Sequence, residues 1–314
     1  MKDKVLFLEP VFQPRIWGGR GLAEKFGYNI PAGNIGECWG ISAHPGGESI
    51  VKNGRHAGKK LSELWQSAPE VFGNQQSDVF PLLIKVLDAN ADLSVQVHPD
   101  DDYAKKYEKG ELGKTECWYV VECDDHAEII FGHHAISKEE AIERIHQNQW
   151  DQFLRRKPVK KGDFFYVPAG TIHALCKGVM VLEVQQSSDT TYRLYDYHRL
   201  DDTGNPRALH LEKSLDVSTI PHINTQPTPV TVVENESLSV VEFVSNEFFT
   251  VSKYEIRGAI KQPFKTPTYR LISVISGEGK LAGYSIKKGD HLILPVEVEE
   301  IALDGTFEMI VAQP

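Results

Sequence analysis

A short motif occurs twice in this chain, and the two copies restrict the folds that are open to it. Lys160-Lys161-Gly162-Asp163 is followed by four residues and Pro168, and Lys287-Lys288-Gly289-Asp290 is followed by four residues and Pro295. The intervening residues, Phe-Phe-Tyr-Val and His-Leu-Ile-Leu, are typical of a strand that leaves a turn. A repeated β unit of this kind predicts a duplicated small barrel.

Only the first copy continues into a histidine. Ala-Gly-Thr-Ile-His173 follows Pro168, whereas Val-Glu-Val-Glu-Glu follows Pro295. Upstream, Gln96-Val97-His98 and Glu116 offer further ligands. Residues i and i+2 of a strand face the same way, so Gln96 and His98 can reach one ion. Two imidazoles, a carboxylate and an amide oxygen form a donor set that suits zinc, so we expect a metal site in the first unit only.

Most of the remaining chain predicts short strands. Runs rich in β-branched and aromatic residues indicate strands at 79–87, 93–98, 116–121 and 127–131. A capping box, Ser137-Lys138-Glu139-Glu140, begins a predicted helical portion at about 137–157, ended by Pro158. Further helices are expected at 209–217 and around 61–65. The proline-rich residues 221–229 predict a linker into a final β segment.

Composition excludes several classes of function. The chain has 314 residues, 41% hydrophobic and 25% charged, as in ordinary globular proteins. A formal net charge of -10 argues against nucleic acid or an anionic membrane as the main partner. The start of the chain lacks a signal-like apolar run, and no later stretch approaches a membrane span, so a cytoplasmic location is expected. The four cysteines lack Cys-x-x-Cys spacing and are expected to be reduced.

Specific motifs then resemble a known family. Gly-x5-Pro-x-Gly-x2-His at 162–173 is similar to the second cupin motif. Gln96-Val97-His98-Pro99-Asp100-Asp101 and Lys114-Thr115-Glu116 resemble the zinc-site signatures of the type I mannose-6-phosphate isomerases. The segment that carries Glu183 and Arg193 also resembles this family. So do two segments near the start of the chain, Trp17-Gly18-Gly19 and Gly36-Glu37-Cys38-Trp39. Two departures are a short chain, with little room for the helical insertion of eukaryotic relatives, and Lys177, where many cupins have asparagine.

The resemblance implies a fold and an activity. It implies a mainly β fold of two cupin-like, jelly-roll barrels with a small helical portion, divided into a catalytic domain at 1–220 and a degenerate cupin-like domain at 230–314. It also implies an isomerase that interconverts mannose 6-phosphate and fructose 6-phosphate. One zinc ion per chain would be held by the ligands implied by the family: Gln96, His98, Glu116 and His173.

The chemistry of that reaction requires particular residue types. Aldose and ketose interconvert by proton transfer through an enediol, so the site needs an acid/base group and positive charge. Glu183, on a predicted strand at 179–185, is the candidate base. Arg193 and Lys114 are the candidate cationic partners of the enediolate or the phosphate, and the sequence does not assign one to each. The expected partner is a small phosphorylated sugar, and the oligomeric state is left open.

Each candidate also has a structural alternative. Lys114 could be a solvated loop lysine beside Gly113, and Arg193 could form an ion pair with Asp189 or Asp196. Asp100-Asp101-Asp102 predicts a solvated turn or helix cap, because consecutive carboxylates on an extended chain point apart. The histidines that are not expected to bind metal include His133, His134, His210 and His291.

Two other functions are compatible with parts of the pattern. Two histidines and a glutamate could hold ferrous iron in an oxygenase, although Gln96 as a fourth ligand and the nearby Lys114 and Arg193 argue against this. A degenerate relative could instead sense a sugar phosphate without turning it over. Retention of the four ligands with Glu183 and Arg193 favours catalysis.

Overall fold

Residues of one central strand alternate between two layers of the protein. In β12 (Val179–Gln186), Val179 and Val181 pack in one core, whereas Met180, Leu182 and Val184 pack in another on the opposite face. Alternation of this kind follows from the two-residue period of a strand, and both faces of β12 are covered. The computed structural model describes residues 4–201, 203–264 and 268–314.

Two sheets make up the first β unit. The six-stranded sheet has the order β10 (Phe164–Val167), β7 (Glu116–Cys123), β12, β5 (Leu82–Asp88), β3 (Ile35–Ile41) and β2 (Val11–Gly19). The five-stranded sheet has the order β13 (Tyr192–Tyr195), β6 (Val95–Val97), β11 (His173–Leu175), β8 (Glu128–His133) and β9 (Leu154–Pro158). Side chains of both sheets form one core, with Trp118 and Phe131 among its larger members. The strands predicted at 79–87, 93–98, 116–121 and 127–131 are confirmed as β5, β6, β7 and β8.

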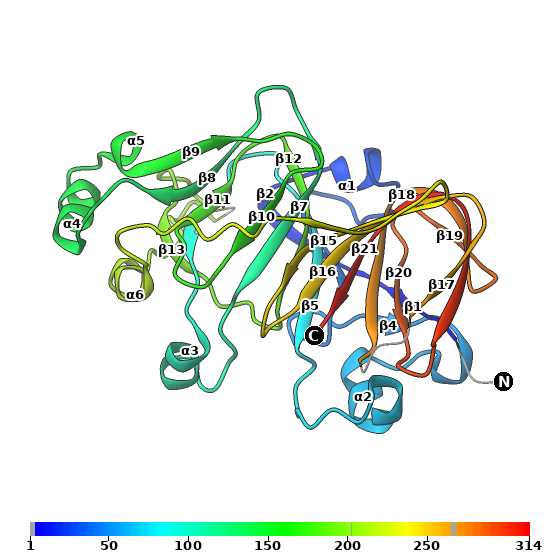
Figure 1. Cartoon of the computed structure of the whole chain (residues 1–314). Coiled ribbons are helices and arrows are strands. Elements are labelled where there is room, and N and C mark those ends of the chain that lie inside the picture. Colours follow the sequence, from blue (N-terminus) through cyan, green and yellow to red (C-terminus); the bar gives the residue numbers. More distant parts are fainter. Residues whose placement is uncertain (1–3, 202, 265–267) are drawn as a thin grey trace.

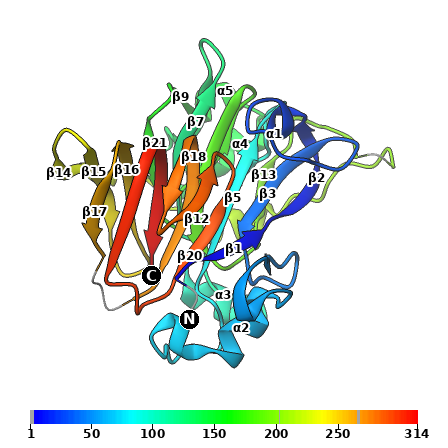
Figure 2. The ribbon, with the colours of Figure 1, turned by 90° about the vertical axis from the view of Figure 1, so that its right-hand side faces the viewer.

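The second β unit is a sheet of ten described strands. Its main path is β14 (Val230–Glu234), β15 (Leu238–Ser245), β16 (Thr250–Arg257), β21 (Glu300–Gln313), β18 (Arg270–Leu281), β20 (His291–Leu294), β1 (Leu6–Glu9) and β4 (Ile50–Val51). Two further strands, β17 (Ile260–Pro263) and β19 (Tyr284–Lys287), pair with β21 and β18. Figure 2 shows β1 from the start of the chain beside strands near its end. The mainly β, jelly-roll-like fold agrees with the prediction.

An apolar core joins the two units. Leu182 and Val184 of β12 lie in the same cluster as Leu271 of β18 and Ile310 of β21. The predicted linker at 221–229 has no helix or strand, and Gln226 is tied to β10 by hydrogen bonds with the backbone of Tyr166 at 2.9 and 2.7 Å. The division at 1–220 and 230–314 stays a prediction, and residues 1–3, 202 and 265–267 of those ranges lie outside the described part.

The helices are short. They are α1 (Gly21–Glu24), α2 (Leu61–Ser67), α3 (Asp101–Tyr107), α4 (Lys138–His146), α5 (Trp150–Phe153) and α6 (Leu211–Val217), with 3-10 turns at Gly54–His56 and Pro69–Phe72. Figure 1 shows α4, α5 and α6 at one end of the molecule, next to the five-stranded sheet. Among the described residues, no helix combines the length and apolar character needed to cross a membrane.

The helical portion predicted at 137–157 is partly wrong. Its start is confirmed, because the Ser137 hydroxyl accepts a hydrogen bond from the Glu140 backbone. The helix ends at His146, however, and Asn148 takes a positive φ of 54°, a conformation that cannot continue a right-handed helix. Leu154–Pro158 is instead strand β9, which pairs with β8 and buries Leu154. The helices expected at 209–217 and around 61–65 are confirmed as α6 and α2.

The two sequence repeats form the same turn. Gly162 and Gly289 have φ values of 91° and 92°, a region that favours glycine. Their backbone N–H groups both donate at 2.9 Å to a carbonyl of a neighbouring strand. The carboxylates of Asp163 and Asp290 accept from the backbone N–H three residues earlier, at 3.0 and 2.8 Å. Each turn leads into a strand of its own unit, β10 in the first unit and β20 in the second.

Candidate active site

Three strands of the first unit bring two histidines and a glutamate together. His98 follows β6, Glu116 begins β7 and His173 begins β11, and their side-chain ligand atoms all lie within 4.8 Å of one another. Nε2 of His173 lies 3.3 Å from Oε1 of Glu116, and Nε2 of His98 lies 3.5 Å from Oε2. All three side chains are buried. Residues that are far apart in the sequence therefore converge on one point.

The backbone fixes the orientation of both imidazoles. His98 donates from Nδ1 to the carbonyl of Thr190, and His173 donates from Nδ1 to the carbonyl of Thr171, each at 2.8 Å. Each Nε2 therefore keeps its lone pair, and both point towards Glu116. Burial, with help from Lys114, holds the pKa of His98 well below its usual range, and burial lowers the pKa of His173 to about 4. Neutral imidazoles are the form that binds metal.

Glu116 and Gln96 complete a donor set that fits a divalent ion. Both carboxylate oxygens of Glu116 are buried, and neither accepts a well-directed hydrogen bond. Gln96 pairs with His173 across β6 and β11, and its Nε2 lies 3.4 Å from Nε2 of His173, so rotation of the amide brings its oxygen to the same point. Oε2 lies 2.9 Å from the ammonium group of Lys114, whereas Oε1 lies near the neutral His173 and meets no donor among the described residues. A buried carboxylate oxygen that meets no cation or donor is costly. The structure brings together the four predicted ligands, and their role as ligands stays a prediction.

Lys114 belongs to this buried cluster. Its side chain is 5% exposed, so the alternative of a solvated loop lysine is wrong. Nζ lies 2.9 Å from Oε2 of Glu116 and donates to Nε2 of His98 at 3.1 Å. Burial alone would lower the pKa of Lys114, but Glu116 and Glu183 outweigh burial and raise it. Lys114 is therefore a charged group at the end of the site that holds Glu116.

Glu183 lies on the inner face of β12 and is buried. Trp118 donates from Nε1 to Oε1 of Glu183 at 2.9 Å, and Nζ of Lys85 lies 3.7 Å from Oε2. Burial and the neighbouring Glu116 raise the pKa of Glu183, although Lys114 and Lys85 oppose the rise. A carboxyl group with a raised pKa is suited to proton exchange near neutral pH.

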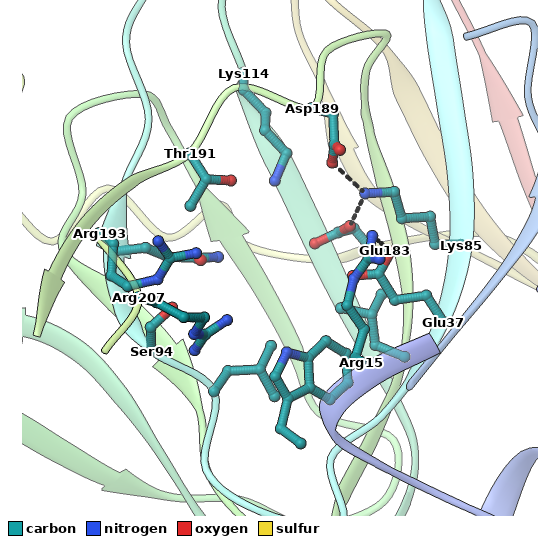
Figure 3. A pocket seen from close by; sticks show the side chains of 14 residues that line it. Arg15, Glu37, Lys85, Ser94, Lys114, Glu183, Asp189, Thr191, Arg193 and Arg207 are labelled. Carbon is teal, nitrogen blue, oxygen red and sulfur yellow. Dashed lines mark hydrogen bonds and ion pairs between the residues drawn. The ribbon is translucent and has the colours of Figure 1, made fainter. Parts of the chain in front are cut away.

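A cleft of about 440 Å³ opens beside these residues (Figure 3). Its lining includes the predicted Gln96, Lys114, Glu183 and Arg193. It also includes charged residues that sequence reasoning did not single out as functional: Arg15, Glu37, Lys85, Asp189 and Arg207. Lys85 could have been found, because it is the one basic residue of the otherwise apolar run before Asp88 in β5. No local signal marks Arg207, which lies in a segment without helix or strand.

Arg193 lies on β13 opposite Gln96, but it does not form either of the ion pairs considered for it. Asp189 lies 3.7 Å from Nζ of Lys85, and Asp196 binds Arg199 and Arg207. Within the described part of the chain, Arg193 has no carboxylate at ion-pair distance. Its Nη1 donates instead to the carbonyl of Ala208 at 2.9 Å.

The helix cap predicted after Pro99 is confirmed. Asp100 caps α3 by accepting from the backbone of Tyr103 at 2.8 Å. Of the histidines set aside, none of His133, His134, His210 and His291 joins the group around Glu116. His210 has a local role, since its Nδ1 accepts from the backbone N–H of Arg193 at 3.1 Å. All four cysteines are free, and Cys38, Cys117 and Cys176 are buried.

A mainly β fold of two jelly-roll-like units, with a buried His-Glu-His group beside a charged cleft, defines a cupin-type protein with a candidate metal site. Residues 5–121 match the model of the catalytic domain of type I phosphomannose isomerase, and residues 239–314 match that of the mannose-6-phosphate isomerase cupin domain. The chain belongs to the type I mannose-6-phosphate isomerase family.

Relatives resemble the chain over nearly its whole length. The probable mannose-6-phosphate isomerase GmuF of Bacillus subtilis is 53% identical over 98% of this chain and 99% of its own, and a mannose-6-phosphate isomerase of Streptococcus mutans is 52% identical over 97% and 96%. The crystal structure of a mannose 6-phosphate isomerase from Bacillus subtilis superimposes with a TM-score of 0.96 at 48% identity, covering 99% of both chains. A mannose 6-phosphate isomerase solved with zinc and yttrium shares the fold, with a TM-score of 0.78 at 14% identity over 99% of both chains.

Proposed function

We propose that this protein interconverts D-mannose 6-phosphate and D-fructose 6-phosphate. The observation that carries the proposal is the buried His98-Glu116-His173 group beside a cleft that contains Glu183, in a chain of this family. An aldose-ketose exchange needs a proton carrier and positive charge near the C1 and C2 oxygens. Glu183 and Lys114 offer these two properties within one cleft.

The metal of the proposal is one zinc ion per chain, held by Gln96, His98, Glu116 and His173. When bound, zinc supplies Lewis-acid polarisation of sugar oxygens without redox chemistry. The ligand set has one carboxylate and three neutral groups, so the loaded site keeps positive charge that favours an enediolate. Lys114 lies at the same end of the cleft, and in this proposal its ammonium group donates to the reacting oxygens.

Glu183 is the proposed acid/base group. Its carboxylate takes the proton from C2 of the open-chain aldose while the C1 carbonyl oxygen gains a proton from the Lys114 ammonium group, which gives an enediol. Return of the proton from Glu183 to C1, with transfer of the proton on the C2 oxygen back to Lys114, gives the ketose. Asp189 is the alternative carrier, because it is 46% exposed in the cleft and contacts the same Lys85. Loss of turnover in Glu183→Gln, with turnover retained in Asp189→Asn, supports Glu183, and the reverse result assigns the role to Asp189.

The partner is a small phosphorylated sugar, and the proposed location is the cytoplasm. The free, mostly buried cysteines support a reducing compartment. Fractionation of cells followed by detection of the protein tests this location, and recovery outside the cytoplasmic fraction would contradict it.

The deciding experiment measures conversion of mannose 6-phosphate to fructose 6-phosphate by chelator-stripped protein, with and without zinc. We expect turnover to vanish on stripping and to return with zinc. If zinc-loaded protein binds the sugar phosphate but does not convert it, the result would favour the alternative of a non-catalytic sugar-phosphate sensor. Activity with ferrous iron and consumption of oxygen would favour the oxygenase.

A further inference from the structure

The segment Lys114-Thr115-Glu116, below called the 114–116 segment, carries two side chains of the buried cluster. Nζ of Lys114 lies 2.9 Å from Oε2 of Glu116, and Thr115 between them is 2% exposed. Because one short stretch of backbone carries both groups, its position sets where each group lies. A displacement of about 1 Å can cost an enzyme about 100-fold in rate. The contacts that hold this segment therefore bear on the chemistry of the site.

Gln186, the last residue of β12, holds Thr115 through both its backbone and its side chain. Its backbone N–H donates to the carbonyl of Thr115 at 3.1 Å, and its side-chain Oε1 accepts from the backbone N–H of Thr115 at 2.9 Å. Gln186 is 6% exposed, so water does not readily replace these bonds. Glu183 lies three residues earlier on the same strand. Gln186 thus links the 114–116 segment to the strand of the proposed acid/base group.

Asp101 holds the other end of the Gln186 amide. Nε2 of Gln186 donates to Oδ1 and Oδ2 of Asp101 at 3.0 and 3.2 Å, and Oδ1 also accepts from the backbone N–H of Gly113 at 2.7 Å. A Cβ at Gly113 would lie 2.5 Å from the backbone nitrogen of Asp101, so the two stretches of chain touch closely. Asp101 follows His98 by three residues. Its carboxylate therefore joins the chain after His98 to the chain just before the 114–116 segment.

The hydroxyl of Thr115 extends the network to the third candidate ligand. Oγ1 accepts from the backbone N–H of Ala169 at 3.3 Å, and the next backbone N–H, that of Gly170, donates to the carbonyl of His98 at 2.9 Å. Ala169 and Gly170 belong to the motif that leads to His173. Hydrogen bonds therefore connect the backbone beside all three residues of the His-Glu-His group.

Donor and acceptor types fix the orientation of the Gln186 amide. A backbone N–H can only donate and a carboxylate can only accept, so Gln186 must turn its oxygen to Thr115 and its nitrogen to Asp101. Neither Gln186 nor Asp101 is among the residues that line the cleft. An effect of either residue on the substrate therefore passes through the 114–116 segment.

We propose that Gln186 and Asp101 are positioning residues. They hold the 114–116 segment so that Lys114 meets the reacting oxygens and Glu116 meets the metal in the geometry that the reaction needs. The inference rests on the proposed function, because it takes Lys114 to serve the substrate and Glu116 to bind zinc.

The test compares Gln186→Met with the matched control Gln226→Met. Gln226 also binds the backbone through its amide, with hydrogen bonds of 2.9 and 2.7 Å to Tyr166, and it does not line the cleft. Steady-state kinetics with mannose 6-phosphate and chelator competition for zinc would be measured on the full-length protein. We expect Gln186→Met to lower kcat and zinc affinity at least about tenfold, with KM changed less than about threefold. Gln226→Met should change all three by less than about threefold.

A paired exchange tests the network itself. Gln186→Glu turns a second carboxylate towards Asp101 and should lower kcat and zinc affinity as Gln186→Met does. Adding Asp101→Asn supplies an amide that donates to the new carboxylate and an oxygen that still accepts from Gly113. We expect this double variant to return to within about fivefold of the wild type in both measurements.

The outcomes separate this inference from the proposed function. Unchanged kcat and zinc affinity in folded Gln186→Met, equal losses in Gln226→Met, or no recovery in the double variant would overturn the inference even if the wild type isomerises the sugar. If the wild type shows no turnover, loss of zinc affinity in Gln186→Met with recovery in the double variant still supports it. If Gln186→Met does not fold, Asp101→Ala takes its place, because Asp101 is exposed. A loss of at least about threefold in zinc affinity is then expected, and an unchanged affinity would overturn the inference.

Discussion

Tyr28 and His291, separated by 263 positions in the sequence, are joined by a hydrogen bond of 2.8 Å between Oη of Tyr28 and Nε2 of His291. The other ring nitrogen, Nδ1, lies 2.8 Å from the hydroxyl of Ser273. His291 is 1% exposed and stands in the second copy of the repeat, at the position that Phe164 takes in the first. The second unit thus uses this histidine to connect the two units.

This connection predicts a pH dependence of stability. Burial lowers the pKa of His291 from 6.5 to about 4. As the pH is lowered, the unfolded chain therefore binds a proton at His291 at a higher pH than the folded chain does. The contribution of His291 to the free energy of unfolding is present above about pH 6.5 and is lost as the pH falls towards 4. We expect about 2 kcal/mol of this loss between pH 7 and pH 4.5.

Urea unfolding of the wild type and of His291→Gln at both pH values measures that loss. Other buried histidines affect the pH dependence of the free energy of unfolding equally in both proteins. The difference between the two pH dependences therefore isolates the contribution of His291. The same loss of stability in wild type and His291→Gln would show that His291 is not held neutral by the fold.

Gly40 leaves the space that His291 occupies. A Cβ at position 40 would lie 2.3 Å from Cε1 of His291, so the ring would have to move and break its hydrogen bonds. We expect Gly40→Ala to lower the free energy of unfolding by about 1–3 kcal/mol. In a His291→Ala background the cost should be much smaller, and a double-mutant cycle by urea unfolding checks this coupling. Additive effects would contradict the contact.

Glu116 is the only carboxylate in the proposed ligand set. Glu116→Gln should reduce zinc affinity by more than about 100-fold, measured by competition with a chromophoric chelator. The matched control is Glu122→Gln on the same strand, because Glu122 pairs with the exposed Lys161 at 2.7 Å. We expect no change of zinc affinity in this control. Equal affinities of wild type and Glu116→Gln would remove Glu116 from the ligand set.

Lys85 influences the proposed proton carrier. Its charge lowers the pKa of Glu183, against the larger effect of burial. Lys85→Met should therefore raise that pKa further, and the acidic limb of the kcat/KM profile should move to higher pH if Glu183 acts as the base. A lower rate with an unmoved profile would show that Lys85 contributes only to substrate binding or packing.

Local patterns predicted much of this molecule. The strands that carry Gln96, Glu116 and Glu183 were predictable because a two-residue period and β-branched composition act over a few residues. The cap at Ser137 was predictable for the same reason, but the end of its helix was not. Leu154–Pro158 pairs with β8, and such long-range pairing can override local helical tendency.

The sequence by itself determined the repeated turns and the mainly β character of the chain and marked the four candidate ligands, because each is indicated by short motifs whose stereochemistry is local. Only the tertiary structure decided that Lys85 faces Glu183, that Asp196 holds Arg207 beside Arg193 and that Tyr28 meets His291. These relationships depend on burial and charge between segments far apart in the chain. Such energies exist only once the sheets have packed and excluded water.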